Sequence, residues 1–237
     1  MIDYTSSTTV KNKSAYNEGL RVYMLSIFKN MGIALIITAI TSMFVASSPQ
    51  LMNLFFNTPL KWVVILSPLI MVFYLGSKIM SMTVQGARTA LWSFSALMGI
   101  SLASLFYVYT EQSLAKVFFI TASLFGAMSI YGHTTKRDLS SMGSFLTMGM
   151  IGLIIASLAN IFFPSPALYN ILSYIGVIIF TLLTAYDVQK LKNIYFSIGS
   201  SGNEAAQKVA IYGALNLYMD FINLFIFLLR IFGMRRD

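Results

Sequence analysis

The sequence contains no cysteine and a single histidine among its 237 residues, and only 10% of its residues are charged. The absence of cysteine excludes disulfides, thiolate metal sites and cysteine nucleophiles. One histidine leaves little material for acid–base catalysis, and no nucleotide-binding, zinc-protease or serine-triad pattern is present. We therefore expect that the protein is not an enzyme.

The scarcity of charge accompanies an excess of apolar residues. Hydrophobic residues make up 57% of the chain, and the mean hydropathy is +0.74. About a quarter of the residues of a typical soluble domain are charged, so this composition indicates an integral membrane protein. Alternating segments of about ten residues, which are typical of a membrane β-barrel, are missing. The predicted fold class is an all-α integral membrane protein.

Several apolar runs have the length of a membrane-spanning helix, for which about 20 residues are needed. Residues 1–29 are predicted to form a cytoplasmic N-terminal segment, and residues 30–237 a single seven-helix transmembrane domain. The one longer polar connection is expected at residues 190–208. The seven predicted spans are residues 31–48, 60–81, 89–109, 115–133, 143–163, 168–189 and 209–233.

The basic residues lie mainly at the ends of these spans, and their distribution predicts the orientation. The N-terminal segment and the connections on its side hold eleven Lys and Arg residues, whereas the opposite side holds five. The positive-inside rule therefore places the N-terminus in the cytoplasm. We expect the net charge of +8 to contact the anionic headgroups of the lipid bilayer and not nucleic acid.

Two acidic residues lie within the predicted spans. Asp220 falls about twelve residues into the seventh span, and Asp187 lies in the last turn of the sixth. A carboxylate at bilayer depth costs roughly 2.5–3.5 kcal/mol, so we expect Asp220 to face protein or water. Spans six and seven run in opposite directions, which permits the two carboxyl groups to meet but does not establish that they do.

Two adjacent carboxylates tend to share a proton, because neighbouring negative charges repel. Asp187 and Asp220 are therefore a candidate pH sensor and ion gate that joins two helices only when protonated or bridged by a metal ion. Carboxylate and amide oxygens also suit Ca²⁺, so both acids are candidate Ca²⁺ ligands. Asn216 and Asn223 lie one turn from Asp220 and are candidate ion-path residues, together with Tyr186.

Simpler interpretations of these residues stay open. Asp187 can be interfacial and pair with Lys190, and Asp220 can form a buried hydrogen bond to Asn, Tyr or Ser groups. Lys78 and Arg88 flank the connection between spans two and three and are either interfacial anchors or a cationic latch for the acids.

Small residues recur at four-residue spacing on two of the predicted spans. Ser95, Gly99 and Ala103 do so in the third, and Ala122 and Gly126 in the fourth. Small residues on one face let helices approach closely, so we favour packing seams over an ion path.

Three segments of the chain resemble a known family. LNLYMDFINLFIFLLRIFG at 215–233 resembles the last-helix signature of the Bax inhibitor-1 family, also called TMBIM or Lifeguard proteins. TAYDVQK at 184–190 is similar to the end of that family's sixth helix, and ALMGISLASLFYVYT at 96–110 to its third. The resemblance covers essentially the whole membrane domain.

The resemblance implies a bundle in which six helices surround a central C-terminal helix. It also implies a pH-sensitive Ca²⁺ leak in which Asp187 and Asp220 match the family's paired aspartates. In the bacterial branch an arginine late in the second helix latches onto that pair. Ser81 stands there in this sequence, with Lys78 one turn earlier as a candidate substitute.

The expected function is a passive Ca²⁺ leak gated by protonation of the paired aspartates, with Ca²⁺ as the transported or transiently bound ion, protons as a second partner and no resident cofactor. The alternative is a non-transporting regulator that binds another membrane protein, since the resemblance associates eukaryotic relatives with suppressing cell death and some bacterial ones with a membrane protease. A proton-coupled carrier is a third interpretation. The expected location is a bacterial plasma (inner) membrane, with an internal eukaryotic membrane as the alternative.

Overall fold

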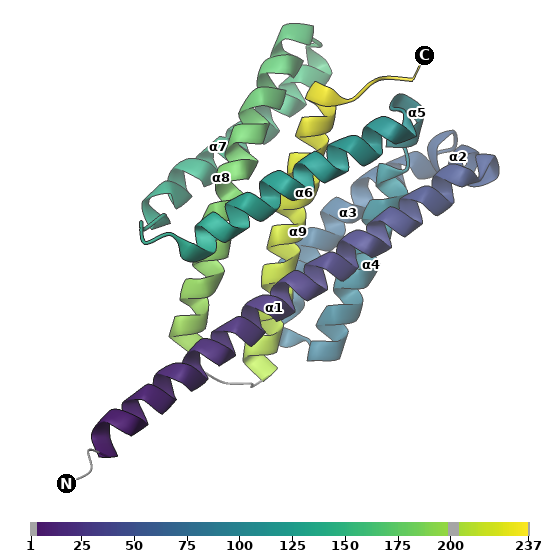
Figure 1. The fold of residues 1–237 in the computed structure, drawn as a ribbon. Coiled ribbons are helices and arrows are strands. Elements are labelled where there is room, and N and C mark those ends of the chain that lie inside the picture. The colour runs from purple at the N-terminus through teal and green to yellow at the C-terminus, as the bar shows by residue number, and fades with distance from the viewer. Residues whose placement is uncertain (1–3, 199–203, 237) are drawn as a thin grey trace.

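The computed structural model describes the backbone of residues 4–198 and 204–236 and the side chains of residues 18–197 and 204–236. Over these ranges the chain is almost entirely helical, and seven helical segments are long and apolar enough to cross a membrane. The prediction of seven spans is confirmed. The helices are α1 (Tyr4–Ser47), α2 (Pro49–Phe56), α3 (Leu60–Lys78), the 3₁₀ turn η1 (Ile79–Ser81), α4 (Val84–Leu102), α5 (Leu105–Val108), α6 (Glu111–Thr134), α7 (Ser140–Phe162), α8 (Pro166–Ile198) and α9 (Glu204–Phe232), as Figure 1 shows.

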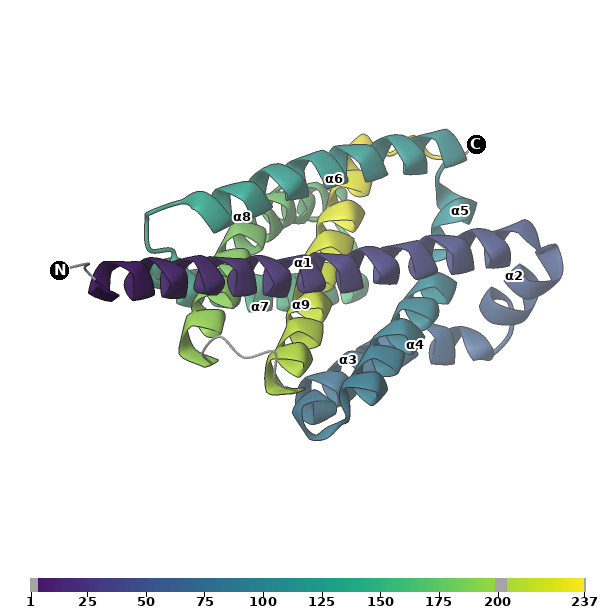
Figure 2. The same ribbon diagram turned by 60° about the horizontal axis from the view of Figure 1, so that its bottom comes forward.

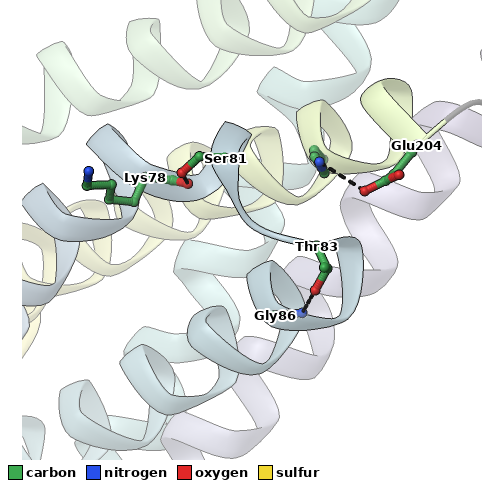
Figure 3. A network of polar contacts seen from close by, with 6 residues as sticks. Lys78, Ser81, Thr83, Gly86 and Glu204 are labelled. Carbon is green, nitrogen blue, oxygen red and sulfur yellow. Dashed lines mark hydrogen bonds and ion pairs between the residues drawn. The ribbon is translucent and has the colours of Figure 1, made fainter.

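Hydroxyl side chains begin several of these helices by accepting hydrogen bonds from otherwise unpaired backbone N–H groups. The Thr83 hydroxyl accepts from the N–H of Gly86 at 3.1 Å and starts α4, as Figure 3 shows. The Thr110 hydroxyl accepts from the N–H of Ser113 at 3.3 Å and starts α6. The cap at Thr83 turns the chain sharply after η1, and α4 packs against α3.

The prediction of a polar connection between helices at residues 190–208 is wrong over most of that range. Helix α8 continues to Ile198, and α9 already begins at Glu204. The helix extends past the expected end because Leu191 and Tyr195 are buried against the core at 2% and 4% exposure. A contact of 3.0 Å between Lys208 Nζ and Glu204 Oε1, one turn apart, supports the first turn of α9.

The N-terminal segment is also more regular than expected, because α1 is continuous from Tyr4 to Ser47. Tyr23, Met24 and Ile27 are buried in the main hydrophobic core, with the three- and four-residue spacing of an amphipathic helix. This part of α1 therefore packs on the bundle, while its position on the cytoplasmic side stays a prediction.

Helix α9 is the most buried of the spans. In its most apolar window 56% of the residues are buried, against 11% for α7. It packs against α1, α4, α6 and α8 and against η1, whereas α3 packs mainly on α4 and α7 mainly on α8 (Figures 1 and 2). The expected ring of six helices around α9 is therefore not confirmed, because four spans supply most of its contacts.

The small residues of α4 form a packing surface, as the sequence indicated. A Cβ added at Gly99 would lie 2.7 Å from the carbonyl oxygen of Thr38, so α1 and α4 touch through their backbones. The corresponding expectation for α6 is wrong at Gly126, where a Cβ would meet nothing within 4 Å. The close approach on α6 occurs instead at Gly132, against the backbone of Ala185 on α8.

Candidate functional site

The two acids of the membrane domain lie on neighbouring helices, Asp187 on α8 and Asp220 on α9. Asp220 is buried, with 6% of its surface exposed, while Asp187 is partly buried. Their carboxyl groups are hydrogen-bonded to one another. A hydrogen bond between two carboxyl groups needs a proton on one of them, so a contact of this kind between α8 and α9 is sensitive to protonation.

The surroundings of the two carboxyl groups provide few other hydrogen-bond partners among the described residues. Asp220 Oδ2 is buried and has no hydrogen-bond partner within the described part of the chain. Lys190, one turn beyond Asp187, contributes a positive charge that acts on both carboxyl groups. Its ammonium also lies 5.7 Å from the centre of the Tyr186 ring. The pair therefore lies at the contact between α8 and α9, with the Lys190 ammonium group nearby on the exposed side of α8.

Contacts between α8 and the segment from α6 to α7 hold Asp187 in place. The side-chain amide of Gln189 donates to the carbonyl of Arg137 and its oxygen accepts from the N–H of Leu139, both at 2.8 Å. Lys192 Nζ donates to the carbonyl of His133, also at 2.8 Å. The sequence did not predict these contacts of Gln189 and Lys192. Their only trace in the sequence is two polar side chains within two turns of Asp187.

The connection between α6 and α7 contains an acidic residue, Asp138, whose surroundings differ from those of the pair. Asp138 is exposed, and its carboxylate accepts a hydrogen bond of 2.9 Å from the backbone N–H of Ser140. That hydrogen bond favours the charged form and lowers the pKa of Asp138 below its ordinary value.

The other candidate ion-path residues are not all brought to the pair. The Asn223 amide donates to the Met219 carbonyl of its own helix at 2.9 Å, and Asn216 is half-buried on α9. The Tyr186 ring lies against Gly143 of α7, where an added Cβ would be 2.5 Å from the Tyr186 hydroxyl. Tyr186 therefore packs between α8 and α7, while its role in an ion path stays a prediction.

The candidate cationic latch does not contact the acids in this structure. Lys78 is exposed at the end of α3, and its carbonyl accepts a hydrogen bond of 2.7 Å from the Ser81 hydroxyl, as Figure 3 shows. Arg88 lines a pocket of about 500 Å³ between α1 and α4, beside Lys29 and Trp92. In residues 18–197 and 204–236 the ion pairs are Arg21 with Glu18 and Lys208 with Glu204.

A second buried polar contact of α9 was also missed. The Thr38 hydroxyl lies 2.7 Å from the hydroxyl of Tyr218, 2.9 Å from the carbonyl of Ser95 and 3.0 Å from the carbonyl of Ala34. This neutral network joins α1, α4 and α9. A threonine in an apolar span gives no sequence signal for it, because its hydroxyl can always bond its own helix.

A resident metal ion would need more ligands than the pair provides. Ca²⁺ takes six to eight oxygens, and two carboxylates offer four at most. No third Asp, Glu, His or Cys joins them to form a metal-type cluster in the ranges that the structure describes.

The seven spans and the carboxyl pair buried between two of them define a polytopic α-helical membrane protein with an acidic site inside its bundle. A family model described as inhibitor of apoptosis-promoting Bax1 matches residues 20–237. The chain belongs to this Bax inhibitor-1 family.

Similar curated proteins come from bacteria. The inner membrane protein YbhL of Escherichia coli (strain K12) is 46% identical, over 92% of this chain and 94% of the relative. The uncharacterized protein RP147 of Rickettsia prowazekii (strain Madrid E) is 44% identical over the full length of both chains. An uncharacterized membrane protein of Streptococcus pyogenes serotype M1 is 34% identical, over 91% of this chain and 93% of the relative. The seven spans make this chain a multi-pass membrane protein.

Proposed function

We propose that the protein is a passive Ca²⁺ pathway whose opening is controlled by protonation of Asp187 and Asp220. The observation that supports this proposal is the hydrogen bond between the two carboxyl groups, one from α8 and one from α9, with Asp220 only 6% exposed. A shared proton between two helices is a contact that pH can break.

Loss of that proton changes the contact from attraction to repulsion. Two carboxylates about 4 Å apart repel by about 4 kcal/mol when the effective dielectric constant is about 20. Such repulsion favours separation of α8 from α9 at Asp220. The two negative charges also attract a cation to the site. We therefore expect the pathway to be closed when the pair is protonated and to open as pH rises.

Ca²⁺ flux in proteoliposomes tests the proposal. Purified protein is reconstituted into vesicles that enclose a Ca²⁺ indicator, and flux is followed between about pH 6 and 8, because coupled carboxyl groups titrate in two steps that such a series can separate. The expected result is a flux that rises with pH.

Substitution of either acid identifies the sensor. In Asp220→Asn or Asp187→Asn a neutral amide can donate to the remaining carboxylate without a titratable proton, so flux should stay low at every pH. Asp138→Asn is the matched control, since it removes one carboxylate from an exposed connection. Unchanged flux and an unchanged pH response in Asp220→Asn would contradict the proposal.

A different outcome would favour the alternative function. If flux never exceeds that of protein-free vesicles, the protein is better explained as a non-transporting regulator, and it should then co-purify with another membrane protein. A gating role for Lys78 or Arg88 would appear as an altered pH response in Lys78→Met or Arg88→Met.

The proposed orientation places the N-terminus in the cytoplasm of a bacterial cell, in the inner membrane. The excess of basic residues on that side supports it. Reporter fusions at the two termini should report opposite sides of the membrane, since seven spans separate them.

A further inference from the structure

A lateral groove runs between α1 and α6, with α9 as its floor; Figure 2 shows both α1 and α6 crossing in front of α9. The groove has a volume of about 410 Å³. Ala39 lines it from α1, Ala115 from α6, and Phe221 and Phe225 from α9. It opens to the outer surface of the bundle, because Met43 and Phe119 at its edges are 62% and 69% exposed.

One end of the groove continues into a polar pocket. Met43, Phe106 and Glu111 line both the groove and a second pocket of about 590 Å³, which Asn53, Asn57 and Arg236 also line. An apolar channel therefore ends beneath a cavity that holds one cationic and one anionic side chain.

The two charged groups are available to a ligand. Arg236 is anchored by its backbone N–H, which donates to the Val108 carbonyl at 2.9 Å, and by Nη1, which lies 3.3 Å from the Phe106 carbonyl. The remaining guanidinium N–H groups keep the fork geometry that suits a phosphate. Glu111 is exposed at the start of α6 and takes part in none of the ion pairs of the described residues.

The length of the groove along α1 is close to the thickness of one leaflet, which an acyl chain spans. Along α1 it extends from Leu35 to Met43, which is about 12 Å at 1.5 Å per residue. One leaflet of the hydrocarbon core is about 15 Å deep. A groove lined mainly by apolar side chains and open to the bilayer is a poor site for water but a good one for a lipid tail.

We propose that this groove and the adjoining pocket bind one phospholipid with a phosphoethanolamine headgroup. One acyl chain lies in the groove over α9, the phosphate contacts the Arg236 guanidinium, and the ammonium contacts the Glu111 carboxylate. The charge pair selects a zwitterionic headgroup with N–H donors over an anionic one. The proposal is independent of Ca²⁺ conduction.

Native mass spectrometry of the purified, delipidated full chain tests the proposal. The protein is incubated separately with phosphatidylethanolamine, phosphatidylglycerol and phosphatidylcholine that carry the same acyl chains. The expected result is one retained phosphatidylethanolamine, with about tenfold weaker retention of the other two lipids. Equal retention of all three lipids would overturn the headgroup assignment.

Matched variants locate the bound lipid. Ala115→Phe fills the groove from α6 and should abolish retention, and Ala39→Phe should do the same from α1. Ala127→Phe is the control, because Ala127 is exposed on α6 but does not line the groove. Glu111→Gln should remove the preference for phosphatidylethanolamine over phosphatidylglycerol, and Arg236→Gln should weaken retention of all three lipids.

Two outcomes would overturn the site. Retention that is unchanged in both Ala115→Phe and Ala39→Phe would show that the lipid does not occupy the groove. Loss of Ca²⁺ flux in Ala115→Phe with unchanged lipid retention would instead assign the groove to a cation path.

Discussion

Helix α9 makes two buried polar contacts that differ in one property. Through Asp220 it bonds the Asp187 carboxyl group on α8, and through Tyr218 it bonds Thr38 on α1. Asp220 and Tyr218 are two residues apart and so point about 200° apart around the helix. The first contact depends on a proton, while the second joins neutral hydroxyl groups.

The comparison shows how one helix can be held on one side and released on the other. The hydroxyl network joins α9 to α1 and α4, and the close approach at Gly99 holds α1 against α4, at any pH near neutrality. Under the proposed function, the carboxyl contact to α8 lasts only while its proton does. A change in pH should therefore move α8 relative to a fixed group of α1, α4 and α9.

The largest expected effect is on the carboxyl contact. Raising the pH should destabilise the wild type by up to about 4 kcal/mol, because two carboxylates then face each other. Asp220→Asn removes the repulsion, so its melting temperature in detergent should not fall over the same pH range. Parallel pH profiles for the two proteins would show that the contact does not control stability.

The contact between α1 and α4 can be disrupted by adding one carbon atom at Gly99. In Gly99→Ala the new Cβ would lie 2.7 Å from the Thr38 carbonyl oxygen, so α1 and α4 must separate. Overpacking of this kind costs about 1–3 kcal/mol. The measurement is thermal unfolding, with Gly126→Ala as the control because nothing lies within 4 Å of its Cβ. Equal melting temperatures in the two variants would contradict the close approach.

A smaller effect is expected when the network loses one hydroxyl group. Tyr218→Phe removes the hydrogen bond to Thr38, and hydrogen bonds between membrane helices contribute about 0.6 kcal/mol on average. The loss of stability in Tyr218→Phe should be the same at every pH, whereas the stability contributed by the carboxyl pair should depend on pH. Tyr174→Phe, at an exposed position, controls for the deletion itself. A pH-dependent loss in Tyr218→Phe would mean that the two contacts are coupled.

The smallest effect concerns Asp138, whose pKa is lowered by the N–H of Ser140. Its stabilising contribution is complete above the unfolded value of 3.8 and is lost as pH falls through the folded pKa, the opposite sign to the carboxyl pair. Asp138→Asn should therefore leave the pH profile near neutrality unchanged. The check is an NMR titration of the Asp138 side chain, which should titrate below 3.8.

Much of the fold could be predicted because the bilayer restricts it strongly. Long apolar segments identify spans directly, and backbone groups in hydrocarbon must bond within a helix. The depth of Asp220 in the last span was visible for the same reason. The ends of helices outside the apolar core were not, since a polar segment such as that after Lys190 can be helix or loop until its packing is known.

The sequence by itself determined the number of spans, the class of protein and the two acids that needed an explanation. Only the tertiary structure decided that Asp187 and Asp220 meet, that Tyr186 packs on α7, and that Lys78 and Arg88 lie away from the acids. These outcomes depend on the rotation and register of each helix against its neighbours. Close approaches such as Gly132 against Ala185 set that register, and they join residues far apart in the chain.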